Sequence, residues 1–123
     1  FDFYAKRNMM HRFNGLVRGH FGDMPIIGFK TQFSMAYSDN FKYNFIQVDR
    51  GTGMNPSVYT EGIHVHQFYG TYLVGPFLIL NPLFTKHLMQ VMGIENPKLA
   101  FEPVIMEAYE RRMKEFMDPK VKF

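Results

Sequence analysis

The most regular alternation of apolar and polar residues lies between residues 32 and 47. On both sides of the turn-forming tripeptide Ser38-Asp39-Asn40, every second residue is aromatic or methionine. These apolar positions are Phe33, Met35, Tyr37, Phe41, Tyr43 and Phe45. Because side chains two residues apart lie on one face of a strand, the pattern predicts a β-hairpin over 32–47 with an aromatic face.

A spacing of three to four residues between apolar positions replaces this alternation in the C-terminal part of the chain. Asn81 and Pro82 are residue types favoured at the N-cap and first position of a helix, so an amphipathic helix is expected over 82–92. A second amphipathic helix is expected over 103–117, with Pro103 in its first turn. The apolar face of this second helix consists of Ile105, Tyr109, Met113 and Phe116.

The segment 62–85 contains no formally charged residue. As a single helix it would reach about 36 Å, which exceeds the roughly 30 Å hydrocarbon core of a bilayer. Pro76 and Pro82 interrupt it, so we expect a proline-broken segment that either spans a membrane or is buried against a partner. Its apolar residues, the expected membrane or partner contacts, are Phe68, Tyr69, Tyr72, Leu73, Val74, Phe77, Leu78, Ile79 and Leu80.

Residues 1–30 are expected to form a basic, extended arm, because several glycines and Pro25 interrupt any regular periodicity there. The positive charges of this arm are Lys6, Arg7, Arg12 and Arg18. Only Asp2 opposes them in the first twenty residues. Such an arm can meet the phosphate groups of lipid or of RNA.

These elements together predict an α+β fold that is mostly helical and extended. The length of 123 residues corresponds to one domain at most. We expect a single non-autonomous subunit over 1–123, in which the arm precedes a hairpin unit at 31–50. A membrane or buried segment at 62–92 and a C-terminal helix and tail at 97–123 would follow.

The composition favours extensive contact with other proteins. Aromatic residues make up 17% of the chain, and there are 10 methionines but no tryptophan or cysteine. Aromatic and methionine side chains are enriched in the cores of protein interfaces. The absence of cysteine excludes disulfides, thiolate catalysis and iron–sulfur ligation. The net charge of +3 is small for a protein that binds nucleic acid along a whole face.

His64 and His66 are the strongest candidates for chemistry. In a strand, both imidazoles would point the same way and could reach one metal ion. The pair superficially resembles the first motif of the cupins, but that family has a glutamate a few residues later, whereas here the nearest acid, Glu61, precedes it. No nucleophile elbow or dinucleotide fingerprint occurs. We therefore predict no enzymatic activity, no catalytic residue, no cofactor and no metal, with His64 and His66 as the weak exception.

The chain runs from a basic arm with Lys6 and Arg7, through an uncharged segment at 62–85, to a charged helix at 103–117. This order resembles the layout of supernumerary subunits of mitochondrial inner-membrane complexes, those of the respiratory chain and of ATP synthase. A start at Phe1 is also expected of a processed mitochondrial protein. The resemblance implies a structural accessory subunit, located at the mitochondrial inner membrane, that stabilises a multi-protein complex without catalysis.

Under this interpretation the partners are other protein subunits and lipid. Two alternatives stay open. One is a subunit of an organellar ribosome, which would use the basic arm to bind RNA. The other is a small metal-dependent enzyme that uses His64 and His66.

Overall fold

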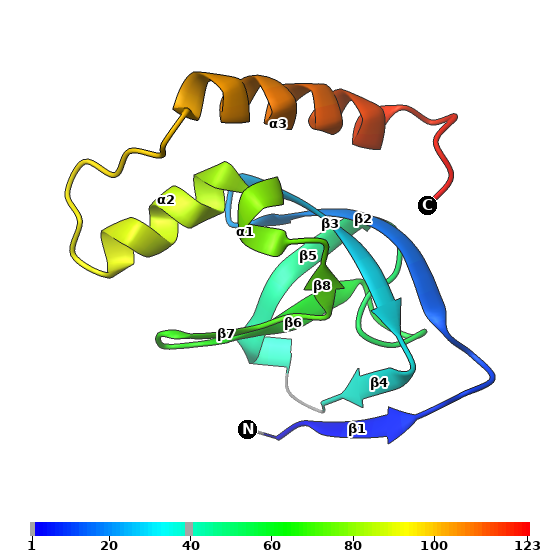
Figure 1. The fold of residues 1–123 in the computed structure, drawn as a ribbon. Helices are drawn as coiled ribbons and strands as arrows, with labels where there is room; N and C mark the ends of the chain where they lie inside the picture. The colour runs from blue at the N-terminus through cyan, green and yellow to red at the C-terminus, as the bar shows by residue number, and fades with distance from the viewer. Residues whose placement is uncertain (1, 39–40) are drawn as a thin grey trace.

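An antiparallel, curled sheet with the strand order β7-β6-β5-β2-β3-β8 forms the body of the computed structural model, which describes residues 2–38 and 41–123 (Figure 1). Its strands are β2 (Phe13–Phe21), β3 (Met24–Gln32), β5 (Asn44–Arg50), β6 (Thr60–Val65), β7 (Phe68–Gly70) and β8 (Leu73–Val74). A separate two-stranded sheet pairs β1 (Tyr4–Arg7) with β4 (Ser34–Tyr37). The helical elements are the 3₁₀ turn η1 (Phe41–Tyr43), α1 (Phe77–Leu80), α2 (Pro82–Val91) and α3 (Glu102–Met117).

The long hairpin of β2 and β3 lies at the centre of the fold. Its register runs without a break to the pair Phe21 and Met24, which leaves a two-residue turn at Gly22 and Asp23. Gly22 has a φ of +58°, a left-handed value that glycine adopts readily. Gly19 lies so close to β5 that a Cβ atom would come within 2.2 Å of a backbone oxygen there. These glycines build a hairpin in the region where the sequence predicted an extended arm.

Both faces of this hairpin are covered. Val17 and Ile26 contribute to the core inside the curled sheet, together with Phe84 of α2. The neighbouring residues Leu16 and Ile27 face the other way and pack beneath α3, which lies along one side of the hairpin (Figure 1). Each face of β2 and β3 is covered over part of its length. The two strands therefore lack the apolar–polar alternation by which they could have been predicted from the sequence.

The two predicted C-terminal helices are confirmed in position, as α2 over Pro82–Val91 and α3 over Glu102–Met117. The predicted face of α3 docks on the sheet, with Tyr109 and Phe116 buried next to Ile27. These helices were predictable because a proline in the first turn and the helical spacing of apolar residues are signals that act within a few neighbouring positions.

The predicted fold class was wrong. The structure is mostly β, with 37% strand and 27% helix, rather than mostly helical and extended. The predicted hairpin over 32–47 does not form either, because β4 pairs with β1 while β5 pairs with β2 and β6. Two of its predicted turn residues, Asp39 and Asn40, lie outside the described residues. Partners distant in sequence replaced the local pairing, as tertiary packing often does for strands.

The uncharged segment 62–85 does not form a membrane helix. It contains most of β6, then β7, β8, α1 and the start of α2. Gly62 and Gly75 adopt φ values of +77° and +91°, and Pro76 directly precedes α1. These positions prevent one continuous helix from running through the segment. In the described part of the chain, no helix combines the length and the apolar character needed to cross a membrane.

The Glu102 carboxylate connects the start of α3 to α2. Its Oε1 lies 2.9 Å from Nζ of Lys86 and accepts a hydrogen bond from the backbone N–H of Leu99 at 3.2 Å. The hydrogen bonds from Lys86 and Leu99 hold the pKa of the Glu102 carboxyl below its ordinary value of 4.5. The contact therefore stabilises the folded state above pH 4.5, and this contribution is lost as the pH falls through the lower folded-state pKa.

Between pH 7 and pH 3, the variant Glu102→Gln is expected to lose less stability than the wild type, because it has no carboxylate to protonate at this position. Urea unfolding at the two pH values measures the effect. Glu110→Gln, at an exposed position of the same helix, is the matched control and should keep the wild-type dependence on pH. An unchanged acid dependence in Glu102→Gln would contradict the assigned role of this contact.

Candidate functional site

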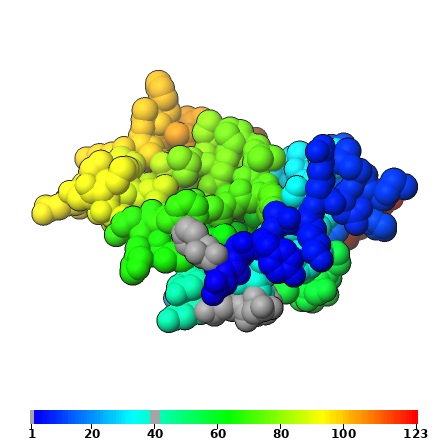
Figure 2. Space-filling view, turned by 90° about the horizontal axis from the view of Figure 1, so that it is seen from below, coloured from blue at the N-terminus to red at the C-terminus, as the bar shows by residue number. Residues whose placement is uncertain are grey.

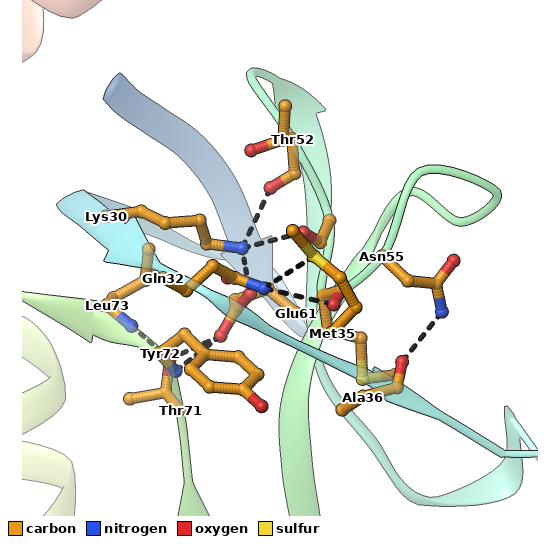
Figure 3. A network of polar contacts seen from close by, with 12 residues as sticks. Lys30, Gln32, Met35, Ala36, Thr52, Asn55, Glu61, Thr71, Tyr72 and Leu73 are labelled. Carbon is orange, nitrogen blue, oxygen red and sulfur yellow. Dashed lines mark hydrogen bonds and ion pairs between the residues drawn. The ribbon is translucent and has the colours of Figure 1, made fainter. Parts of the chain in front are cut away.

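Lys30 and Glu61 form an ion pair that is closed off from solvent (Figure 3). Lys30 lies on β3 and Glu61 on β6, and both residues are 0% exposed. In the order of the sheet, β5 and β2 separate these two strands. The pair therefore joins parts of the sheet that come together only because the sheet curls.

The Lys30 ammonium uses all of its hydrogen atoms. It donates to Oε2 of Glu61, to the carbonyl oxygen of Gly53 at 2.8 Å and to that of Thr52 at 3.1 Å. Burial lowers the pKa of the Lys30 amine, and the charge and hydrogen bond of Glu61 act in the opposite direction. A buried ammonium with three acceptors has no hydrogen left to direct at a substrate.

The second carboxylate oxygen of Glu61 organises the turn before β8. Oε1 accepts hydrogen bonds from Oγ1 of Thr71 at 2.9 Å and from the backbone N–H of Tyr72 at 2.6 Å. Burial raises the pKa of the Tyr72 hydroxyl, and the negative charge of Glu61 raises it further. Since both oxygens of Glu61 are engaged, the ion pair is suited to hold four chain segments together rather than to exchange protons with a ligand.

Gln32 extends this polar network toward β4 (Figure 3). Its Nε2 donates to the carbonyl oxygens of Ser34 at 2.9 Å and Met54 at 3.2 Å. Asn55 adds a hydrogen bond from Nδ2 to the carbonyl oxygen of Ala36 at 2.7 Å. These contacts fix β4 against the loop that precedes β6, and so position the two-stranded sheet beside the large one.

Of the two histidines that the sequence singled out, only His64 lies in a strand. The His64 ring stacks on Tyr69 with 4.2 Å between ring centroids, and its Nε2 lies 2.9 Å from the backbone oxygen of His66. His66 follows the end of β6 and has a φ of +53°, so the strand geometry assumed for joint metal binding does not hold. Within residues 2–38 and 41–123, no three histidine, aspartate or glutamate side chains are grouped to hold a metal ion.

The basic residues of the predicted arm lie in strands and turns. Lys6 and Arg7 belong to β1, Arg18 belongs to β2, and Arg12 precedes β2. The Arg12 guanidinium donates to Oγ1 of Thr31 from Nε at 3.1 Å and from Nη2 at 2.8 Å. Arg7 and Thr31 line the same surface depression, so the side chains of Arg7 and Arg12 flank one place on the surface.

The predicted membrane or partner contacts divide into three groups. Leu73 is buried in the core, and Phe77 and Leu80 pack against the two apolar clusters. Tyr69 and Tyr72 are half-buried. The exposed members are Phe68, Val74, Leu78 and Ile79.

The last two of these belong to a larger apolar area, here called the α1–α3 patch. It consists of Leu78, Ile79, Leu99 and Ile105, which line one depression, and of the exposed residues Phe101 and Val104 at the start of α3. Ile79, Phe101 and Val104 are 70%, 81% and 67% exposed. A shallow depression of about 150 Å³ lies between the α1 residues and the first turn of α3.

The sequence matches no protein-family model, and a comparison with curated proteins gives no match. The arrangement of the residues is therefore the basis for assigning a function. Sequence reasoning missed the pairing of Lys30 with Glu61 and the contribution of Phe101 and Val104 to a surface patch. One signal was present, because Glu61 is the only formal charge between Gly51 and Thr85, and a charge in an apolar environment needs a partner.

Proposed function

We propose that this chain is a non-catalytic accessory subunit of a multi-protein complex and that the α1–α3 patch binds a neighbouring subunit. The supporting observation is the exposure of three large apolar side chains: Ile79, which lines the depression, and Phe101 and Val104 at the start of α3, close in sequence to its lining residues Leu99 and Ile105. Contiguous exposed apolar areas of this kind mark interaction sites in soluble proteins. A few side chains that fill well-packed pockets of the partner typically carry most of the binding energy at an interface.

The internal use of the polar residues supports a structural role. The buried ammonium of Lys30 and the carboxylate of Glu61 are fully engaged with each other and with backbone groups. Catalytic acids and bases need a site for a substrate within hydrogen-bond reach. The Lys30–Glu61 pair instead stabilises the curled sheet, against which the helices α1 and α3 pack.

For the host we propose a mitochondrial inner-membrane complex of the respiratory chain or ATP synthase, as the layout of the chain predicts. Attachment through the α1–α3 patch would depend on protein contacts, so this proposal does not require a helix of this chain to cross the membrane. An organellar ribosome subunit stays the alternative predicted from the basic residues.

The double variant Ile79→Asp with Phe101→Asp is expected to lose its place in the complex. Two desolvated charges at an interface centre should weaken binding at least thirty-fold, because truncation of a single hot-spot residue alone costs roughly 2 kcal/mol or more. The test is a native gel after mild detergent extraction, with the chain followed by immunodetection. Both residues are exposed, so the thermal unfolding of the isolated variant should match that of the wild type.

Tyr59→Asp is the matched control, because Tyr59 is 71% exposed and lies on the loop before β6, outside the patch. The control variant should migrate with the complex. Normal assembly of the double variant, or equal loss of assembly in Tyr59→Asp, would contradict the proposed docking surface.

A further inference from the structure

A second apolar feature lies on another part of the surface, between the β1–β4 sheet and the β6–β7 hairpin. In Figure 2 the N-terminal segment, in dark blue, crosses this face next to the green residues of the hairpin. The cleft has a volume of about 290 Å³, and carbon atoms form most of its wall. The lining residues that matter here are Ala5, Ala36, Met54, Ile63, Gly70 and Tyr72. Below, this feature is called the β1 cleft.

The β1 cleft adjoins a cationic depression. The depression has a volume of about 390 Å³, and Tyr72 contributes to the walls of both. Ala5 lines the cleft and Arg7 lines the depression, and residues two apart in β1 point to the same side. The inner side of β1 therefore changes from apolar to positively charged along its length.

Among residues 2–38 and 41–123, no ion pair offsets the positive charge at this end. Arg7 donates from Nε to the sulfur of Met9 at 3.2 Å, and Arg12 donates to Thr31. No carboxylate of the described residues forms an ion pair with either guanidinium. Glu61 accepts a hydrogen bond from the backbone N–H of Tyr72, but its charge is paired with Lys30 and so does not offset the positive charge of the two arginines.

The geometry points to a binding site for a free, single-chain anionic amphiphile, of which a medium-chain carboxylate is the simplest example. The acyl chain would occupy the β1 cleft and the carboxylate would meet Arg7 and Arg12, whose guanidinium groups match the two oxygens of a carboxylate. The cleft volume equals that of about ten water molecules at ~30 Å³ each. A methylene group takes up similar space, so a chain of medium length fits. This site is independent of the α1–α3 patch.

Isothermal titration with decanoate tests the inference directly. We expect saturable one-to-one binding of decanoate. In shorter homologues, each methylene group removed should weaken binding by up to about four-fold. Decanol, which has the chain without the charge, should bind at least several-fold more weakly. The absence of saturable decanoate binding, or equal affinity for decanol, would overturn the proposal. So would association with anionic vesicles alone, because that result would identify a bilayer surface as the ligand.

Two variants of β1 locate the two ends of the ligand. Arg7→Gln should weaken decanoate binding about five-fold, as expected for loss of one partly exposed charge partner. Lys6→Gln is the matched control, because Lys6 directly precedes Arg7 in β1 and, by the alternation of the strand, points to the opposite side from Ala5 and Arg7. Ala5→Trp should block the cleft and abolish binding. All residues of β1 are exposed, so these variants should fold, which circular dichroism verifies.

Equal affinities of Arg7→Gln and Lys6→Gln would overturn the placement of the carboxylate. Undiminished binding by Ala5→Trp would overturn the placement of the chain. Failure of these experiments would leave the complex-assembly test of the α1–α3 patch unaffected, since the two surfaces share no residue.

Discussion

Replacing Glu61 with alanine is expected to destabilise the protein by about 3–5 kcal/mol, because the substitution leaves the buried Lys30 ammonium without its counter-ion. The two carbonyl oxygens of Thr52 and Gly53 remain as acceptors, but they carry no net charge to offset the desolvated cation. Since small domains are stable by only ~5–15 kcal/mol, the loss is a large part of the total.

Urea unfolding at pH 7 measures this loss. Glu107→Ala is the matched control, because Glu107 pairs with Arg111 at 2.8 Å on the exposed face of α3, where such pairs contribute about 0.5 kcal/mol or less. The double variant Lys30→Met with Glu61→Leu should recover much of the lost stability, because it removes both charges and keeps most of the volume. A Glu61→Ala variant as stable as Glu107→Ala would contradict the role assigned to the ion pair.

Replacing Asn81 with aspartate is expected to cost about 2–4 kcal/mol of stability. Its amide nitrogen donates to the carbonyl oxygens of Ile27 and Phe77 at 2.8 and 2.9 Å, and its Oδ1 accepts the N–H of Ile27 at 2.8 Å. The side-chain amide of Asn81 thus hydrogen-bonds to the backbone of β3 as a residue of an additional strand would. Asn81 is 1% exposed. In an ionised aspartate, the oxygen that replaces Nδ2 would place negative charge against these two carbonyl oxygens and could donate no hydrogen bond to them.

Asn14→Asp provides the control, because Asn14 is exposed on β2 and the same substitution there should change stability by less than about 0.5 kcal/mol. Besides unfolding in urea, hydrogen exchange of the Ile27 amide gives a local readout. We expect this amide to exchange faster in Asn81→Asp, since its acceptor is held less firmly. Unchanged exchange together with unchanged stability would show that Asn81 does not secure the edge of β3.

Asn81 also shows where sequence reasoning reached only part of the answer. Asn81 and Pro82 correctly marked the beginning of α2, and Pro82 occupies its first turn. The side chain of Asn81, however, makes no capping hydrogen bond and binds β3 instead. The residue type was sufficient to predict the helix start, whereas the use of the amide depended on β3, which is distant in sequence.

The candidate sites follow the same division. An isolated Glu61 in an uncharged segment indicated a buried group in need of a partner, but nothing near it in sequence identified Lys30. His64 and His66 were selected by a rule for extended strands, and the turn that begins after Val65 removed the geometry on which that rule depends.

The sequence by itself determined the elements whose signals are local. The start residues and apolar spacing of α2 and α3 act within a few positions along the chain, so both helices were predicted close to their observed limits. Only the tertiary structure decided the sheet. β2 and β3 are covered on both faces and show no alternation, and the pairings of β1 with β4 and of β2 with β5 join residues about thirty positions apart. The ion pair, the β1 cleft and the α1–α3 patch all arise from this packing, because each combines residues that only the folded chain brings together.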